Sequence, residues 1–142
     1  VGRATTDTLT NKSLTSPIIN TPSASGHVYS GTYTPTLTGV TNVASVTSAA
    51  AQYLRVGSVV TVSGRVTLTA SGAGATSLRV SIPVASNFGV AADCTGVFAF
   101  GTSPVTIGDV TADAVNNEAL FSFTAGDGSL HSYYFTFTYQ II

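Results

Sequence analysis

A chain of 142 residues is long enough for one domain with an extension. Charged residues make up only 8% of the chain and the formal net charge is −1. These values exclude a charge-rich disordered tail, and they also exclude the concentrated positive field that nucleic-acid binding needs. No apolar run reaches about 18 residues, so we expect no membrane insertion.

The N-terminal stretch, residues 1–26, differs from the rest of the chain. Leu9, Leu14 and Ile19 lie five residues apart among short polar residues, and Pro17 stops any helix. A spacing of five fits neither an α-helix nor a half-buried strand. A segment with so few apolar side chains cannot fold alone. We therefore expect an extended stalk that packs against copies of itself through these three side chains.

A head domain over residues 27–142 follows the stalk. Short alternating runs separated by turn residues predict an all-β fold, an antiparallel β-sandwich of jelly-roll type with about eight strands. The first run, residues 27–40, contains Pro35. Because proline lacks a main-chain donor, this run is expected to be an edge strand or two short strands.

The clearest hairpin joins residues 51–56 to residues 59–70. Gly57-Ser58 lies between them and suits a type II′ turn. In the second arm, alternate residues are apolar, and Gly64 falls on the apolar side. We expect a bulky side chain to cross the strand at this glycine.

The later strands are expected to be separated by turns. They are predicted over residues 76–82, 93–101, 105–112, 118–125 and 131–142. The last strand is the most aromatic. Its core face is expected to carry Tyr133, Phe135, Phe137, Tyr139 and Ile141, and its semi-polar outer face is expected to touch a neighbouring subunit.

Asp127, Ser129 and His131 are the three residue types of a hydrolase triad, and GDGSL superficially resembles a GDSL-type motif. However, the motif has an extra glycine, and all three residues lie in or beside one turn. A triad needs its members to converge from separate elements beside an oxyanion hole. We therefore interpret this group as a polar turn and expect no catalytic residue.

Oxygen-bearing side chains also gather around one turn near residue 115. They are Asp109, Asp113, Asn116, Asn117 and Glu118. A calcium site could be built from them, but their spacing matches no EF-hand loop. A solvated turn is the preferred interpretation, and we expect neither a metal nor a cofactor. Four tyrosines, Tyr29, Tyr33, Tyr53 and Tyr134, could stack on sugars, although sheet or interface positions are favoured for each.

The segment Thr8–Pro17 resembles the LTNKTLTSP element of tailed-bacteriophage tail fibres and related virion proteins, with Ser13 in place of the commoner Thr. Residues 31–37, 53–57 and 59–66 are similar to a small β domain at the C-terminal end of such fibres. The resemblance covers the stalk and the first half of the head.

This resemblance implies a homotrimeric virion protein that is assembled in the bacterial cytoplasm and joined to upstream fibre or tail proteins. Its expected function is non-enzymatic attachment to a bacterial surface polysaccharide or protein receptor, with a glycan favoured. The alternative is a purely structural trimerisation or capping module of a fibre. An enzyme such as a polysaccharide depolymerase is disfavoured, because the chain offers few acids and no predicted cleft.

Loops on a rigid scaffold are the natural place for recognition. If residues 27–40 run away from the stalk and every later connection reverses direction, the loops at residues 41–50, 71–75, 102–104 and 126–130 lie farthest from it. The candidate receptor-binding residues are then Asn42, Thr102, Ser103, Asp127, Ser129 and His131. If Pro35 instead makes a hairpin of the first run, the opposite loops take their place.

Overall fold

The computed structural model describes residues 28–100 and 106–142. Its ten strands are β1 Val28–Tyr33, β2 Leu37–Thr41, β3 Val43–Ser48, β4 Ala51–Val56, β5 Val59–Ala70, β6 Gly74–Val80, β7 Cys94–Phe100, β8 Thr106–Asp113, β9 Glu118–Ala125 and β10 Leu130–Gln140. A short 3-10 turn, η1 Ala91–Asp93, precedes β7. The described residues contain no helix with the length and apolar character to cross a membrane.

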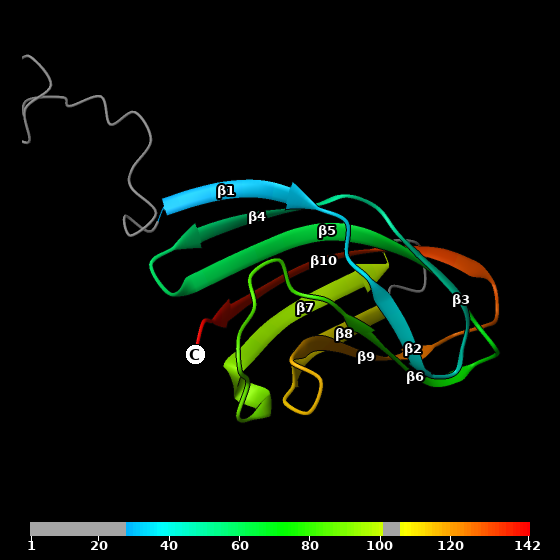
Figure 1. Cartoon of the computed structure of the whole chain (residues 1–142). Helices are drawn as coiled ribbons and strands as arrows, with labels where there is room; N and C mark the ends of the chain where they lie inside the picture. Colours follow the sequence, from blue (N-terminus) through cyan, green and yellow to red (C-terminus); the bar gives the residue numbers. More distant parts are fainter. Residues whose placement is uncertain (1–27, 101–105) are drawn as a thin grey trace, which may run out of the picture.

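All strand pairs are antiparallel and belong to one sheet, in the order β1-β4-β5-β10-β7-β8-β9-β6-β2, with β3 paired to β5 off this path. The sheet curls around one core (Figure 1). The all-β antiparallel prediction is therefore confirmed. The sandwich of about eight strands is not confirmed, because hydrogen bonding joins all ten described strands into a single curled sheet.

Pro35 splits the first strand region into β1 and β2, which pair with different neighbours, β4 and β6. This agrees with the expectation of two short strands. No hairpin forms at the proline, since the antiparallel pairings make both strands run in the direction of β5. The break is held in place by Ser81, whose hydroxyl accepts a hydrogen bond of 2.9 Å from Thr36 N and whose carbonyl accepts one of 3.0 Å from the Tyr33 hydroxyl.

Residues 41–50, expected as a loop, instead contain β3, which pairs with β5 from Val43↔Ala70 to Ser48↔Val66. The physical reason is the length of β5. Its 12 residues exceed what the six residues of β4 can pair, so β3 and β4 share the same edge of β5 in succession. The opposite edge of β5 pairs with β10.

The hairpin between β4 and β5 forms as predicted, with Val56 opposite Val59. Gly57 has a φ of 61°, and Ser58 has no positive φ, which is the pattern of a type II′ turn. The crossing expected at Gly64 is also confirmed. A Cβ at this position would lie 2.7 Å from Phe135 Cζ and 2.8 Å from Ala51 Cβ.

The inward faces of the strands form one aromatic core. Tyr133, Phe135, Phe137 and Tyr139 of β10 are each at most 5% exposed. Phe98 packs on Phe121, Phe123 and Tyr133, with ring centroids between 5.0 and 5.6 Å apart. The core therefore occupies the inward face of the sheet, and the ends and the outer face are the parts left open to solvent.

Candidate functional site

The connections between strands gather at two opposite ends of the curled sheet (Figure 1). The described chain begins at Val28, which pairs with Val56 beside the turn at Gly57-Ser58. We call this the near end. The C-terminus lies there too, because Ile141 N donates a hydrogen bond of 2.7 Å to Ser58 O.

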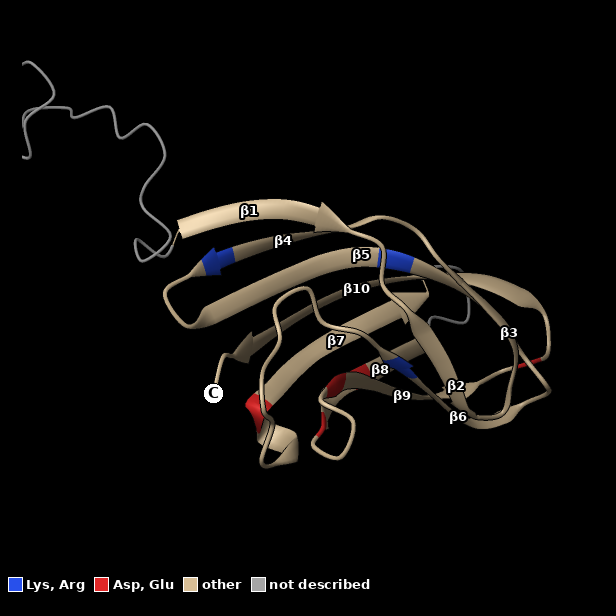
Figure 2. Cartoon of the chain, viewed as in Figure 1, with Lys and Arg blue, Asp and Glu red and all other residues tan. Residues whose placement is uncertain are grey.

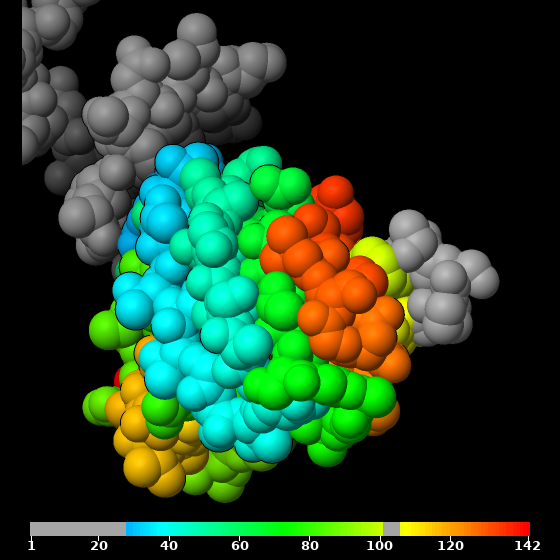
Figure 3. All heavy atoms as spheres, turned by 90° about the vertical axis from the view of Figure 1, so that its right-hand side faces the viewer, coloured from blue at the N-terminus to red at the C-terminus, as the bar shows by residue number. Residues whose placement is uncertain are grey.

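The opposite end, which we call the far end, carries three turns side by side (Figure 3). They connect β2 to β3 at Asn42, β5 to β6 at residues 71–73, and β9 to β10 at residues 126–129. Ser71 N donates to Asn42 O at 3.1 Å, and a Cβ on Gly128 would lie 3.2 Å from Ala70 O. These loops are the ones expected to lie farthest from the start of the head, except that β3 replaces most of the expected loop at residues 41–50.

Asn42 joins two of these turns. It has a φ of 55°, and its side-chain amide donates to Gly72 O at 2.9 Å and to Thr76 Oγ1 at 2.8 Å. Asparagine tolerates this left-handed conformation better than most residues. Both amide hydrogens are therefore used inside the protein, and the geometry assigns Asn42 a structural part in the site.

Asp127 organises the turn between β9 and β10. Its Oδ1 accepts hydrogen bonds from Ser129 N at 2.8 Å and from His131 Nε2 at 2.9 Å. The bond from the Ser129 backbone, followed by the bond from His131, lowers the pKa of the Asp127 carboxyl. The carboxylate is 57% exposed, so it remains open to solvent while it fixes the turn.

His131 also packs against Phe100, with ring centroids 4.1 Å apart and the ring planes tilted by 39°. Both Ser129 N and His131 contact the same carboxylate, so the order of contacts is not the serine–histidine–carboxylate series of a triad. The structure thus brings Asp127, Ser129 and His131 together with the Asn42 turn. Thr102 and Ser103 lie outside the described residues, and their assignment stays a prediction.

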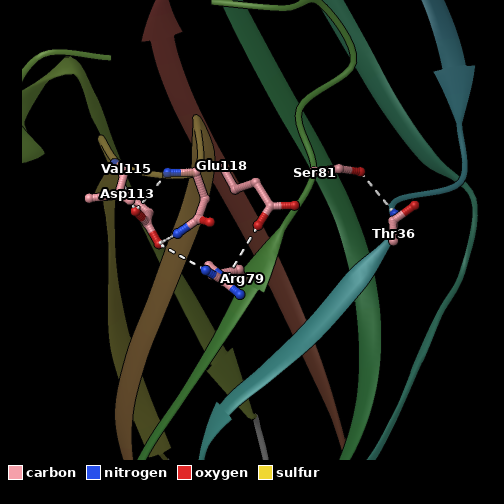
Figure 4. Close-up of polar contacts among 7 residues, drawn as sticks. Thr36, Arg79, Ser81, Asp113, Val115 and Glu118 are labelled. Carbon is pink, nitrogen blue, oxygen red and sulfur yellow. Dashed lines mark hydrogen bonds and ion pairs between the residues drawn. The ribbon is translucent and has the colours of Figure 1, made fainter. Parts of the chain in front are cut away.

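The acidic turn near residue 115 is arranged around an arginine (Figure 4). Arg79 Nη1 lies 3.6 Å from Asp113 Oδ2, and Arg79 Nε lies 3.4 Å from Glu118 Oε2. The second contact is an ion pair by distance but does not have the geometry of a hydrogen bond. A guanidinium thus lies between the two carboxylates, where a bound cation would have to sit.

The Asp113 carboxyl is further engaged by its own turn. Desolvation alone would raise the pKa of this group, but hydrogen bonds from Asn116 and from Val115 N, with the charge of Arg79, lower it overall. Asn117 is also committed, since its Oδ1 accepts from Phe88 N at 2.8 Å. Across the described residues, no group of three or more acidic, histidine or cysteine side chains is arranged to hold a metal ion.

The four tyrosines considered for sugar stacking separate into two environments. Tyr29, Tyr33 and Tyr53 pack edge to face on the inner side of β1 and β4, with centroids 6.0 and 6.1 Å apart. Arg55 lies over the Tyr29 ring at 5.6 Å. Tyr134 is different, because it points outward from β10 and is 62% exposed.

An open hollow on the outer face of the sheet was not predicted from the sequence. It has a volume of about 590 Å³ and lies where the edge partner of β5 changes from β3 to β4. Its lining residues include Ala49, Ala50, Gln52, Ser63, Arg65 and Tyr134. Strand alternation predicts that each of these polar side chains points outward. It does not predict that they lie close together, because that depends on the pairing register of β4, β5 and β10.

We compared the chain with known proteins by family, by sequence and by structure. No family model, curated protein or solved structure matches it.

Proposed function

We propose that this chain is the C-terminal part of a tailed-bacteriophage tail fibre, and that its head attaches to the bacterial surface without catalysis. The sequence support is the resemblance of Thr8–Pro17 to the fibre element. In this proposal residues 1–26 form the trimeric stalk, joined to upstream fibre or tail proteins of the virion. The stalk contacts Leu9, Leu14 and Ile19 lie outside the described residues.

The observation that carries the attachment function is the gathering of the far-end turns. Val28 is the first described residue of the head. The turns that converge at the opposite end contain Asn42, residues 71–73 and Asp127–His131. A fibre tip must present its binding surface away from the stalk. Turns on a filled, rigid sheet can do so without disturbing the core.

The chemistry of this end favours a glycan as receptor. Its polar groups include the exposed carboxylate of Asp127 and the partly exposed imidazole of His131 beside the Phe100 ring, and the exposed Leu130 side chain lies next to them. Hydroxyl-rich ligands are recognised by such hydrogen-bonding groups together with an aromatic face. Nothing in this surface resembles the basic stripe of a nucleic-acid binder.

The direct test is adsorption of the fluorescently labelled 142-residue chain to a panel of bacterial strains, followed by a glycan array. Saturable binding to some strains, and competition by their purified surface polysaccharide, is the expected result. Absence of binding across strains that the parent phage infects would contradict the attachment function.

A purely structural role is the second candidate, and an apolar patch at the near end favours it. Val28, Leu54, Val56 and Val59 point outward from β1, β4 and β5 and are between 45% and 54% exposed. We call these four residues the near-end patch. A contiguous exposed patch of this kind is typical of an interface, and a second copy of the chain would fit it without charge repulsion.

The oligomeric state of the chain distinguishes the structural role from the attachment role. Light scattering coupled to size exclusion should show a trimer for the full chain, and a Leu54→Lys, Val56→Lys double variant should dissociate it. Val115→Lys, at a near-end turn residue that is 90% exposed, is the matched control. A trimer that survives the double variant would remove the near-end patch as a subunit contact, and removal of residues 1–26 would then measure the part of the stalk.

A further inference from the structure

The outer-face hollow forms because β5 is longer than the strands beside it. β3 leaves β5 after Ser48, and β4 joins it from Gln52, so residues 49–50 cross the gap between them. Both crossing residues are alanines, and Ala49 N holds the segment in place by donating to Arg65 O at 3.1 Å. Small side chains at the crossing leave a hollow of about 590 Å³ open to solvent.

Four side chains with hydrogen-bonding groups line this hollow from three adjacent strands. Gln52 of β4 is directly opposite Ser63 of β5, and Arg65 of β5 is directly opposite Tyr134 of β10. Directly opposed residues have Cβ atoms about 4.5–5.5 Å apart. An amide, a hydroxyl, a guanidinium and a phenol therefore share one small area of the outer face.

The guanidinium of Arg65 differs from those of the other arginines in the described residues. Arg55 donates from Nε to Gly57 O at 2.7 Å, and Arg79 lies between Asp113 and Glu118. Arg65 is exposed and, within the described residues, has no side-chain hydrogen bond or ion pair. It is thus available to an external acceptor.

Among the residues that the structure describes, no charge near Arg65 neutralises it. It is the only charged residue on the outward positions of β1, β4, β5, β7 and β10 (Figure 2). The outward Asp109 belongs to β8, three strands away, which at the usual spacing is about 14 Å. A lone positive charge in an uncharged hollow favours a ligand with one negative charge rather than a polyanion.

We propose that this hollow binds an acidic saccharide, that is, a sugar unit carrying a carboxylate. The carboxylate would pair with Arg65 in the bidentate geometry that a planar guanidinium favours. The apolar face of the sugar ring would lie against Tyr134, and its hydroxyls would bond to Gln52 and Ser63. The volume is within the roughly 300–1,000 Å³ of small-molecule sites. This site lies on the sheet face, so it is separate from the far-end attachment surface.

The test uses the full 142-residue chain and two acidic probes that each carry one carboxylate, methyl galacturonide and 3′-sialyllactose. Their neutral counterparts are the methyl ester of methyl galacturonide and lactose. Binding is followed by calorimetry and by amide chemical shifts in ¹H–¹⁵N spectra. We expect at least one acidic probe to bind and to shift the amides around Gln52, Arg65 and Tyr134, with its neutral counterpart binding about tenfold more weakly or not at all.

Two variants with the same change in net charge separate the site from general electrostatics. Arg65→Gln should weaken binding of the acidic probe by about tenfold, and Arg55→Gln, on the inner face, should change it by less than about twofold. Tyr134→Ala should weaken binding to both the acidic probe and any neutral probe that binds. Circular dichroism and melting curves check that each variant is folded.

Several results would overturn the proposal. They are failure of both acidic probes to bind, equal affinity for acidic and neutral probes, equal effects of the two arginine variants, and shifts confined to another part of the protein. Burial of Tyr134 by a second copy in the native oligomer, seen as protection from iodination, would also overturn it. None of these results depends on adsorption to cells. The attachment function can therefore be wrong while the hollow still binds an acidic saccharide, and the hollow can fail to bind one while the attachment function is right.

Discussion

The end of β10 and the Asp127 turn are held together in different ways. Where β10 ends, at the near end, the side-chain bonds join residues far apart in sequence: the Tyr139 hydroxyl donates to Val84 O at 2.8 Å and accepts from Val84 N at 3.1 Å, and the Ser86 hydroxyl donates to Gln140 O at 2.8 Å. At the far end the Asp127 turn is bonded within itself, through Ser129 and His131. The near end closes the fold, whereas this far-end turn only shapes a surface.

This difference predicts different effects of substitutions on the free energy of unfolding. Removing a long-range bond at the near end leaves buried polar groups without partners, which is costly. Removing a bond inside an exposed turn lets water replace it. Exposed far-end side chains can therefore be changed at little cost in stability, and Asn42, which spans two turns, is the exception.

The largest expected effect concerns Cys94, which pairs with Tyr139 near the near end and is 1% exposed. Desolvation raises the pKa of its thiol to about 12. At pH 8, four units lower, only about one thiol in 10,000 is ionised even before access is considered. A thiol reagent should thus react at least about a thousandfold faster in denaturant than in buffer. Rapid reaction in buffer would show that the near end opens readily.

Tyr139→Phe should destabilise the protein by about 2 kcal/mol, because both Val84 main-chain groups lose a partly buried partner. Urea unfolding followed by circular dichroism measures the change. Tyr134→Phe is the matched control, since that hydroxyl is exposed and its loss should cost less than about 0.5 kcal/mol. Equal effects of the two substitutions would remove the distinction between the closed end and the open surface.

A pair of asparagines with the same φ of 55° compares the two ends directly. Asn42→Ala and Asn117→Ala should each cost about 1–2 kcal/mol, because each loses hydrogen bonds and strains a left-handed residue. Asn42→Gly and Asn117→Gly keep the backbone relaxed and isolate the hydrogen bonds. If Asn42→Ala left the melting temperature unchanged, the role of Asn42 as a tie between turns would be wrong.

The smallest expected effect concerns the titration of the Asp127 carboxyl at the far end. The pKa of Asp127 is lowered from 3.8 by the Ser129 backbone N–H and then by His131. A lowered folded-state pKa contributes stability above the unfolded value that is lost as pH falls through the folded value. Carbon NMR of the carboxyl should show Asp127 titrating below 3.8. His131→Ala should raise its pKa only part of the way, because the Ser129 bond remains.

Alternation predicted most of the fold, but it could not predict register. The strands on either side of Gly57-Ser58 and the crossing at Gly64 follow from apolar periodicity and turn chemistry. β3 was missed because its small residues alternate weakly and its pairing depends on the unexpected length of β5. The hollow was missed for the same reason, since it exists only where β3 gives way to β4.

The far-end residues were predicted by counting how often the chain reverses direction. That count does not require knowledge of which residues pair between strands. That count placed Asp127, Ser129 and His131 at one end with Asn42, as the structure has them. It could not predict that the Asn42 amide is consumed by Gly72 and Thr76, because side-chain bonding depends on the approach of two turns.

The most direct test of far-end recognition is a pair of bulky substitutions at exposed serines, Ser129→Trp at the far end and Ser58→Trp at the near end. Both residues are exposed turn positions, so each variant should fold like the parent chain. Adsorption of the labelled protein to susceptible cells should fall at least about tenfold for Ser129→Trp and stay within about twofold for Ser58→Trp. Loss of adsorption with Ser58→Trp alone would contradict the account and move recognition to the near end.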